Sequence, residues 1–156
     1  YNPTNKTINL SESVYASNSI AAAAVAAHET GHAIQDAYGY APLRVRSALV
    51  PVISFASQWS FLLIIVGIIL INTMPAIFWA GIALIALSAI FSVITLPVEY
   101  NASNRAMQWL EASGTLHGEA LQQAGTALRW AARTYLVAAL SAIATLLYYI
   151  GFARRD

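Results

Sequence analysis

The chain has 156 residues, of which 58% are hydrophobic and only 10% are charged, and its formal net charge is +1. Soluble domains carry about 25% charged residues, so this composition and a mean hydropathy of +0.59 predict an integral membrane protein. The near-neutral charge, without a basic patch, argues against a nucleic-acid-binding role. Because the chain contains no cysteine, disulfides, thiolate ligands and a cysteine nucleophile are excluded.

The first fifteen residues are polar and include the turn-forming pair Asn2-Pro3. Residues 6–10 alternate in polarity as a short strand does. Such a strand could bind an extended peptide along its edge, or it could pack as a small hairpin on the helix that follows. Since the sequence begins at Tyr1 rather than Met, we expect that an N-terminal piece has been removed or left out, and any signal or anchor segment in that piece is not visible here.

A helix is predicted over residues 18–39. Serine and asparagine side chains at positions 17–19 can cap its start, and residues 21–27 are almost entirely alanine, the strongest helix former. Gly39 and then Pro42 are placed to end it. The small side chains of the alanine run also favour close approach of a neighbouring helix.

This helix carries the sequence His28-Glu29-Thr30-Gly31-His32. Two histidines four positions apart project from one helix face, where both rings can bind a single metal ion. Glu29 lies about 100° further round the helix, within reach of a water molecule at that ion. Neutral imidazole suits zinc, so the pattern predicts a catalytic zinc site with Glu29 as general base. The alternative is a pair of surface histidines that flank a glutamate by chance.

Two apolar stretches, residues 49–71 and 76–98, are each long enough to cross a bilayer. No charged residue occurs between Arg46 and Glu99. The turn-forming sequence at 72–75 joins the two stretches, so a transmembrane hairpin is predicted.

The remaining chain is predicted to form two amphipathic helices, at 97–112 and 119–133, and a third membrane span at 134–152. The predicted fold is therefore an all-α membrane protein. A single domain, residues 1–156, is expected, in which the motif helix packs against the hairpin and the third span. Most arginines near the spans fall on the motif side, which predicts that this side is cytoplasmic. The arginines on that side are Arg44, Arg46, Arg105, Arg129 and Arg133, against Arg154 and Arg155 on the other.

A catalytic zinc needs a third protein ligand from another part of the chain. A third histidine six residues after His32 is excluded, because Tyr38 stands there. Glu99 is the strongest candidate, since a carboxylate at the end of a membrane span is costly to bury unless it is paired or bound to metal. Its alternative is an ion pair with Arg105. The other candidates, which we expect to be mostly exposed, are Glu12, Asp36, Glu111, His117 and Glu119.

Three sequence blocks support a comparison with a known family. They are Tyr1-Asn2-Pro3 with Asn9-Leu10-Ser11, then residues 25–36 around the histidine motif, and then residues 96–106 around Glu99. In these blocks the chain resembles the YugP-like neutral zinc metallopeptidases of bacterial membranes. The resemblance implies a multi-pass endopeptidase of the glutamate-ligand (gluzincin) type in a bacterial cell membrane. It implies Zn²⁺ bound by His28, His32 and Glu99, with Glu29 as the catalytic carboxylate.

Two residues depart from the pattern of the family and its relatives. Asn101 stands where the family often has aspartate, and Ser103 stands where related glutamate-type peptidases place an aspartate. Both residues, with Asp36, are candidates for orienting the ligands through hydrogen bonds. A tyrosine or Arg105 could stabilise the oxyanion.

The predicted activity is metal-assisted hydrolysis of peptide bonds in membrane or membrane-associated proteins. The expected partners are a peptide or protein substrate and the lipid bilayer. Other membrane proteins and a second copy of the chain are further candidate partners. The main alternative is an inactive membrane scaffold or adaptor that zinc stabilises. A second alternative, metal transport, is disfavoured because the first two spans contain no ionisable residue.

Overall fold

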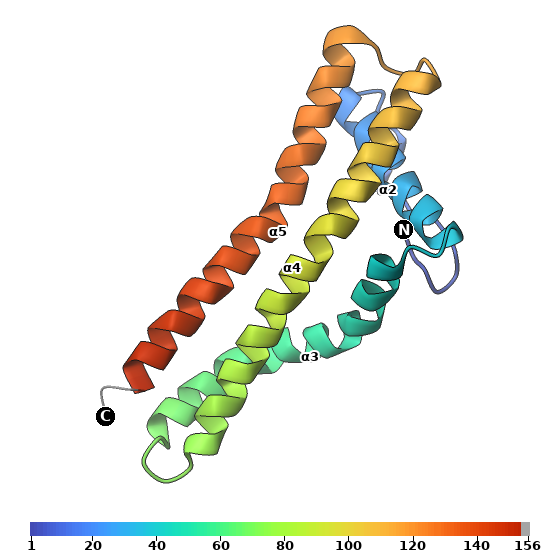
Figure 1. The fold of residues 1–156 in the computed structure, drawn as a ribbon. Helices are drawn as coiled ribbons and strands as arrows, with labels where there is room; N and C mark the ends of the chain where they lie inside the picture. The colour runs from blue at the N-terminus through green and yellow to red at the C-terminus, as the bar shows by residue number, and fades with distance from the viewer. Residues whose placement is uncertain (154–156) are drawn as a thin grey trace. The chain divides into compact units, whose positions relative to one another are not determined.

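The computed structural model describes residues 1–153, which form five helices (Figure 1). Three of them are long and apolar enough to cross a membrane. The all-α membrane fold expected from composition is therefore confirmed. The helices are α1 (Glu12–Tyr15), α2 (Ile20–Ala37), α3 (Ala41–Ile69), α4 (Pro75–Ala112) and α5 (Gly118–Ala153). Arg154 and Arg155, used above to predict orientation, lie outside the described residues.

The N-terminal segment differs from the expected strand. Within residues 1–153 the only β-type pairing is a single antiparallel bridge between Asn2 and Thr7. Two backbone hydrogen bonds close it, at 2.9 and 3.3 Å, and Lys6 takes a positive φ of 59° in the turn. Since no second strand lies beside residues 6–10, their alternation does not produce a ladder.

The motif helix α2 closely matches its prediction. The Ser19 hydroxyl caps it by accepting a hydrogen bond from the Ala22 amide at 3.2 Å. Gly39 follows the helix with a φ of 67°, a conformation that glycine adopts without steric cost.

The predicted amphipathic helices at 97–112 and 119–133 are not separate elements. They are the two ends of α4 and α5 that lie outside the most apolar parts of these helices. Pro97 lies inside α4 rather than in a first turn. The helix continues through it because membrane-spanning helices tolerate the loss of the one N–H group that proline lacks. Gly114 and Gly118, both at positive φ, bracket the turn between α4 and α5.

The chain divides into two compact units, described separately below. The first, which we call the motif unit, consists of residues 1–47 and 95–134. The second, the apolar unit, consists of residues 48–94 and the described residues from Tyr135 onward. That the whole chain is a single domain stays a prediction.

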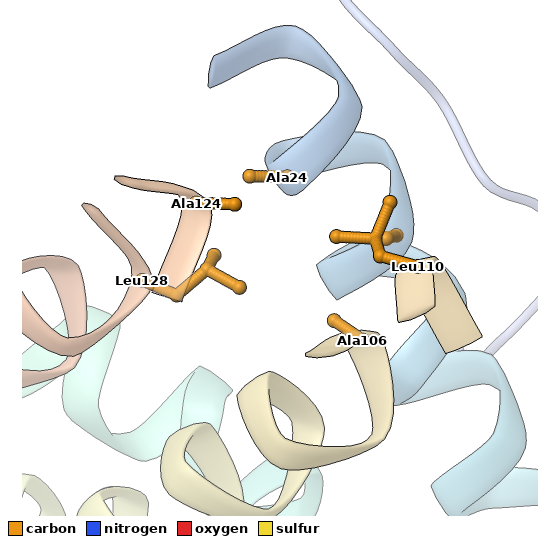
Figure 2. Packing of buried hydrophobic residues seen from close by; sticks show 6 residues of the cluster. Ala24, Ala106, Leu110, Ala124 and Leu128 are labelled. Atoms are coloured by element: carbon orange, nitrogen blue, oxygen red, sulfur yellow. The ribbon is translucent and has the colours of Figure 1, made fainter. Parts of the chain in front are cut away.

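In the motif unit, α2 packs against the C-terminal part of α4 and the N-terminal part of α5. Figure 2 shows alanine and leucine side chains from the three helices meeting in one small core. Gly31 makes the closest approach, since a Cβ atom added to it would lie 2.5 Å from the Ala102 carbonyl oxygen. The alanines and this glycine therefore bring α2 close to α4, as their small size predicts. The buried core residues are Ala24, Ala27, Ala106, Leu110, Ala124 and Leu128.

In the apolar unit, α3 and α4 form the predicted hairpin. Ile64 of α3 packs against Phe78 and Ile82 of α4, and a Cβ atom added to Gly67 would overlap the Phe78 backbone. Large apolar side chains cover the outside of this unit, as in Phe61, which is 69% exposed. An outer surface of this kind is suited to lipid rather than water.

Candidate metal centre

Three side chains that are distant in sequence converge in the motif unit. His28 and His32 come from α2, and Glu99 comes from α4. Their potential ligand atoms all lie within 4.8 Å of one another. The Glu99 Oε2 atom is 3.1 Å from His28 Nε2 and 3.7 Å from His32 Nε2. His32 and Glu99 are each only 6% exposed.

The local sequence explains why these groups meet. Four residues advance an α-helix by slightly more than one turn, so His28 and His32 share a face, and their ring centroids are 4.7 Å apart. Glu99 lies about one turn before Ala102, at the point where Gly31 lets α4 approach α2 most closely. Close packing of small residues thus brings the carboxylate to the imidazoles.

The group satisfies the chemical requirements of a zinc site. Two imidazole nitrogens and one carboxylate oxygen are ligands that zinc binds readily, and three protein donors leave a position open for water or substrate. The Nδ1 atom of each histidine already has a partner on the other side of its ring, whereas both Nε2 atoms face Glu99. The arrangement of donors therefore fits Zn²⁺.

Two neutral side chains provide the partners of the histidine Nδ1 atoms. Ser103 Oγ lies 3.2 Å from His28 Nδ1. Gln35 Oε1 lies 2.9 Å from His32 Nδ1. Contacts of this kind fix the ring orientation of metal-binding histidines.

Arg46 is the nearest cation to Glu99. Its Nη2 atom is 3.4 Å from Glu99 Oε1, so the guanidinium and the two imidazoles contact different oxygens of the carboxylate. An ion pair between Glu99 and Arg105 was the alternative to metal binding that the sequence left open. Arg105 instead donates from Nε to Asn101 Oδ1 at 2.9 Å.

Asp36 lies at the end of α2 and binds the N-terminal segment. It accepts hydrogen bonds from the Tyr1 hydroxyl, at 2.5 Å, and from the Lys6 ammonium group. The hydrogen bond from Lys6 lowers the pKa of Asp36. The hydrogen bond to Asp36 raises the pKa of the Tyr1 hydroxyl to about 12. Asp36 therefore ties the N-terminal segment to the motif helix.

Glu29 lies between His28 and His32 in the sequence of α2 and is half-buried. Its Oε2 atom accepts a hydrogen bond from the main-chain nitrogen of Tyr1. The side chain is 26% exposed, so its carboxylate remains open to water. The remaining third-ligand candidates from the sequence are exposed, namely Glu12, Glu111, His117 and Glu119.

Sequence reasoning did not identify Gln35 or Arg46 as part of this site. Gln35 follows His32 by three positions, so helix periodicity alone could have placed it on the same face. No comparable signal existed for Arg46, whose position depends on how the start of α3 packs.

Comparison with known proteins agrees with this geometry. The model of the family described as "Putative neutral zinc metallopeptidase" matches residues 1–154. The chain is 39% identical over 150 residues to "Putative membrane protease YugP" of Bacillus subtilis (strain 168). These aligned residues make up 96% of this chain. The same match spans 66% of that relative's length. No solved structure matches the chain. The chain therefore belongs to this family of neutral zinc metallopeptidases, for which Zn²⁺ is the expected cofactor.

Proposed function

We propose that the protein is a zinc-dependent membrane endopeptidase of the gluzincin type, in which His28, His32 and Glu99 hold the metal. The observation that carries the proposal is the convergence of these three side chains from two helices within 4.8 Å. Membership of a zinc metallopeptidase family supports the reaction class, and peptide substrates follow from it.

Glu29 acts as the general base and acid of the reaction. A bound zinc ion would lower the pKa of a coordinated water to about 7 and polarise the scissile carbonyl. Glu29 would take a proton from the attacking water and then deliver it to the leaving amine. Its position directly after His28 in α2 and its partial exposure support this role, because the carboxylate remains open to water.

Arg46 holds Glu99 in the orientation that metal binding needs. Its guanidinium lies beside Oε1, which leaves Oε2 directed at the two imidazoles. Arg105, which the sequence suggested as an oxyanion donor, is bonded to Asn101 and lies over the Tyr38 ring at 5.8 Å. Its proposed contribution is therefore to hold the segment around Asn101 in place.

The proposed substrates are membrane or membrane-associated proteins, cleaved at the cytoplasmic surface of a bacterial cell membrane. Three helices able to span a bilayer support the membrane location, and the arginines near the motif side support the orientation. The polar side chains around Glu99 favour cleavage at the membrane surface over cleavage within the bilayer. Other membrane proteins or a second copy of the chain are proposed as further partners.

The test is Glu29→Gln in the full chain, purified in detergent and loaded with zinc. Because Glu29 is not a proposed ligand, the variant should keep one zinc per chain, while hydrolysis of a denatured membrane protein should fall by about 10²–10⁴-fold. Glu119→Gln, on the exposed start of α5, is the matched control and should cleave normally. Undiminished hydrolysis in Glu29→Gln would remove the general-base assignment. Zinc-dependent folding without hydrolysis in the wild type would favour the scaffold alternative.

A further inference from the structure

The Gln35 side chain links α2, which carries the two histidines, to the part of α4 that carries Glu99. Its side chain is completely buried. The amide oxygen contacts His32 Nδ1 at 2.9 Å. The amide nitrogen donates to the Val98 carbonyl at 2.8 Å and to Asn101 Oδ1 at 3.0 Å.

These contacts determine which way the Gln35 amide points. The Val98 carbonyl can only accept a hydrogen bond, so it requires the NH₂ group of the amide on its side. Asn101 Oδ1 also accepts from Arg105 Nε and imposes the same requirement. A flipped amide would place its oxygen against two acceptors. The Gln35 oxygen must therefore face His32.

The amide orientation in turn determines the tautomer of His32. An amide oxygen can only accept, so Nδ1 of His32 must carry the hydrogen. In a neutral imidazole the other nitrogen, Nε2, then keeps its lone pair. Nε2 is the atom that faces Glu99. The lone pair thus points to the centre of the ligand cluster.

We propose that Gln35 is a positioning residue that fixes His32 in the metal-binding tautomer and fastens α2 to the turn of α4 that carries Glu99. Val98 and Asn101 lie directly before and two residues after Glu99, so the two amide N–H bonds hold that turn in place. This inference rests on the proposed zinc site but not on the proposed hydrolysis.

His28 provides an internal comparison. Its Nδ1 atom contacts the Ser103 hydroxyl, which can either donate or accept. Ser103 therefore orients the ring without determining its tautomer. Loss of Gln35 should consequently reduce zinc affinity more than loss of Ser103.

A carboxylate cannot replace the Gln35 amide. In Gln35→Glu the side chain could still accept from His32 Nδ1, but it would lose both N–H donors. It would also place negative charge against the Val98 carbonyl and Asn101 Oδ1. The Glu variant should therefore fail in the same way as the Ala variant, although glutamate accepts hydrogen bonds more strongly than an amide does.

The experiment measures zinc affinity by chelator competition on the full chain in detergent, without any substrate. Gln35→Ala and Gln35→Glu should each lose about 10–100-fold in affinity. Ser103→Ala should lose less than Gln35→Ala. Gln122→Ala, on the exposed face of α5, is the matched control and should bind as the wild type does. Helical content by circular dichroism shows whether each variant has folded.

A second measurement does not depend on any variant folding. Nitrogen-15 NMR of the histidine side chains in the metal-free wild type should show His32 with its hydrogen on Nδ1. Hydrogen on Nε2, or an affinity within about twofold of wild type in folded Gln35→Ala, would overturn the inference. A chain that binds zinc and shows this tautomer but cleaves no protein would refute the proposed hydrolysis and leave the role of Gln35 intact.

Discussion

The motif unit and the apolar unit are both built from closely packed helices, yet their side chains are distributed in opposite ways. The motif unit buries polar groups, including His32, Gln35 and Glu99. Among its described residues, the apolar unit buries hydrophobic side chains such as Phe78 and exposes others such as Phe61. Buried polar groups need specific partners, whereas apolar groups in a bilayer need mainly shape and lipid. Chemistry is therefore expected only in the motif unit.

Substituting a glycine tests how far each unit depends on close helix packing, and it should give the largest effect. A Cβ atom at Gly31 would lie 2.5 Å from the Ala102 carbonyl oxygen, whereas one at Gly151, in α5, would meet no atom within 4 Å. Gly31→Ala should therefore destabilise the protein by about 1–3 kcal/mol, the usual cost of overpacking. It should also weaken zinc binding by pushing α4 from α2.

Gly151→Ala is the matched control, because it adds the same methyl group to a helix. With no steric conflict it should be neutral or stabilising by up to about 1 kcal/mol, since alanine favours helix more than glycine does. Thermal unfolding and zinc competition on both variants provide the comparison. Equal behaviour of the two variants would show that the approach of α2 to α4 is not sterically limited.

Removing Arg46 tests whether the buried carboxylate of the motif unit depends on its cation. Without zinc, Arg46→Ala leaves Glu99 without its guanidinium partner, so the metal-free protein should lose up to about 3 kcal/mol of stability. With zinc bound, the metal supplies compensating charge, and the loss should be smaller. The measurement is the unfolding midpoint with and without zinc. A destabilisation of the same size in both states would contradict a shared role for Arg46 and the metal at Glu99.

The smallest expected effect concerns the N-terminal segment of the motif unit. The hydrogen bond from Lys6 lowers the pKa of Asp36 in the folded protein. A group with a depressed folded pKa stabilises the protein above its unfolded pKa, about 3.9 for aspartate, and this contribution is lost as the pH falls through the folded value. Lys6→Ala should therefore lose less stability than the wild type does when the pH is lowered from neutral to below 4. The measurement is the unfolding midpoint of the wild type and of Lys6→Ala as a function of pH. The same pH dependence in both proteins would exclude the Asp36 contribution.

Much of the fold could be predicted because each signal came from one stretch of sequence. The alanine run, the capping serine and Gly39 located α2, and the uncharged stretch from Arg46 to Glu99 located the hairpin. Helix ends were harder to predict. Nothing local to Pro97 or Thr134 shows that the amphipathic helices continue from the spans, because helices cross the polarity boundary without a break.

The site could be predicted only as far as charge and metal-ligand chemistry are visible in sequence. The histidine motif and the cost of burying Glu99 identified the three groups that the structure brings together. Gln35 carries no charge, so its importance depends on contacts to Val98 and Asn101 in another helix. In the sequence, Arg46 served only to indicate membrane orientation and to mark the start of the uncharged stretch, because its contact with Glu99 depends on tertiary packing.

The most direct test of the account is X-ray absorption spectroscopy at the zinc edge, on the wild type and on Glu99→Ala. The wild type should show two imidazole nitrogens and carboxylate oxygen at about 2.0–2.2 Å, with one zinc per chain. Glu99→Ala should lose the carboxylate and bind zinc more weakly than Gln35→Ala does, while Glu111→Ala, an exposed residue of the same helix, should match the wild type. An unchanged coordination shell and affinity in Glu99→Ala would contradict the claim that this carboxylate completes the metal centre.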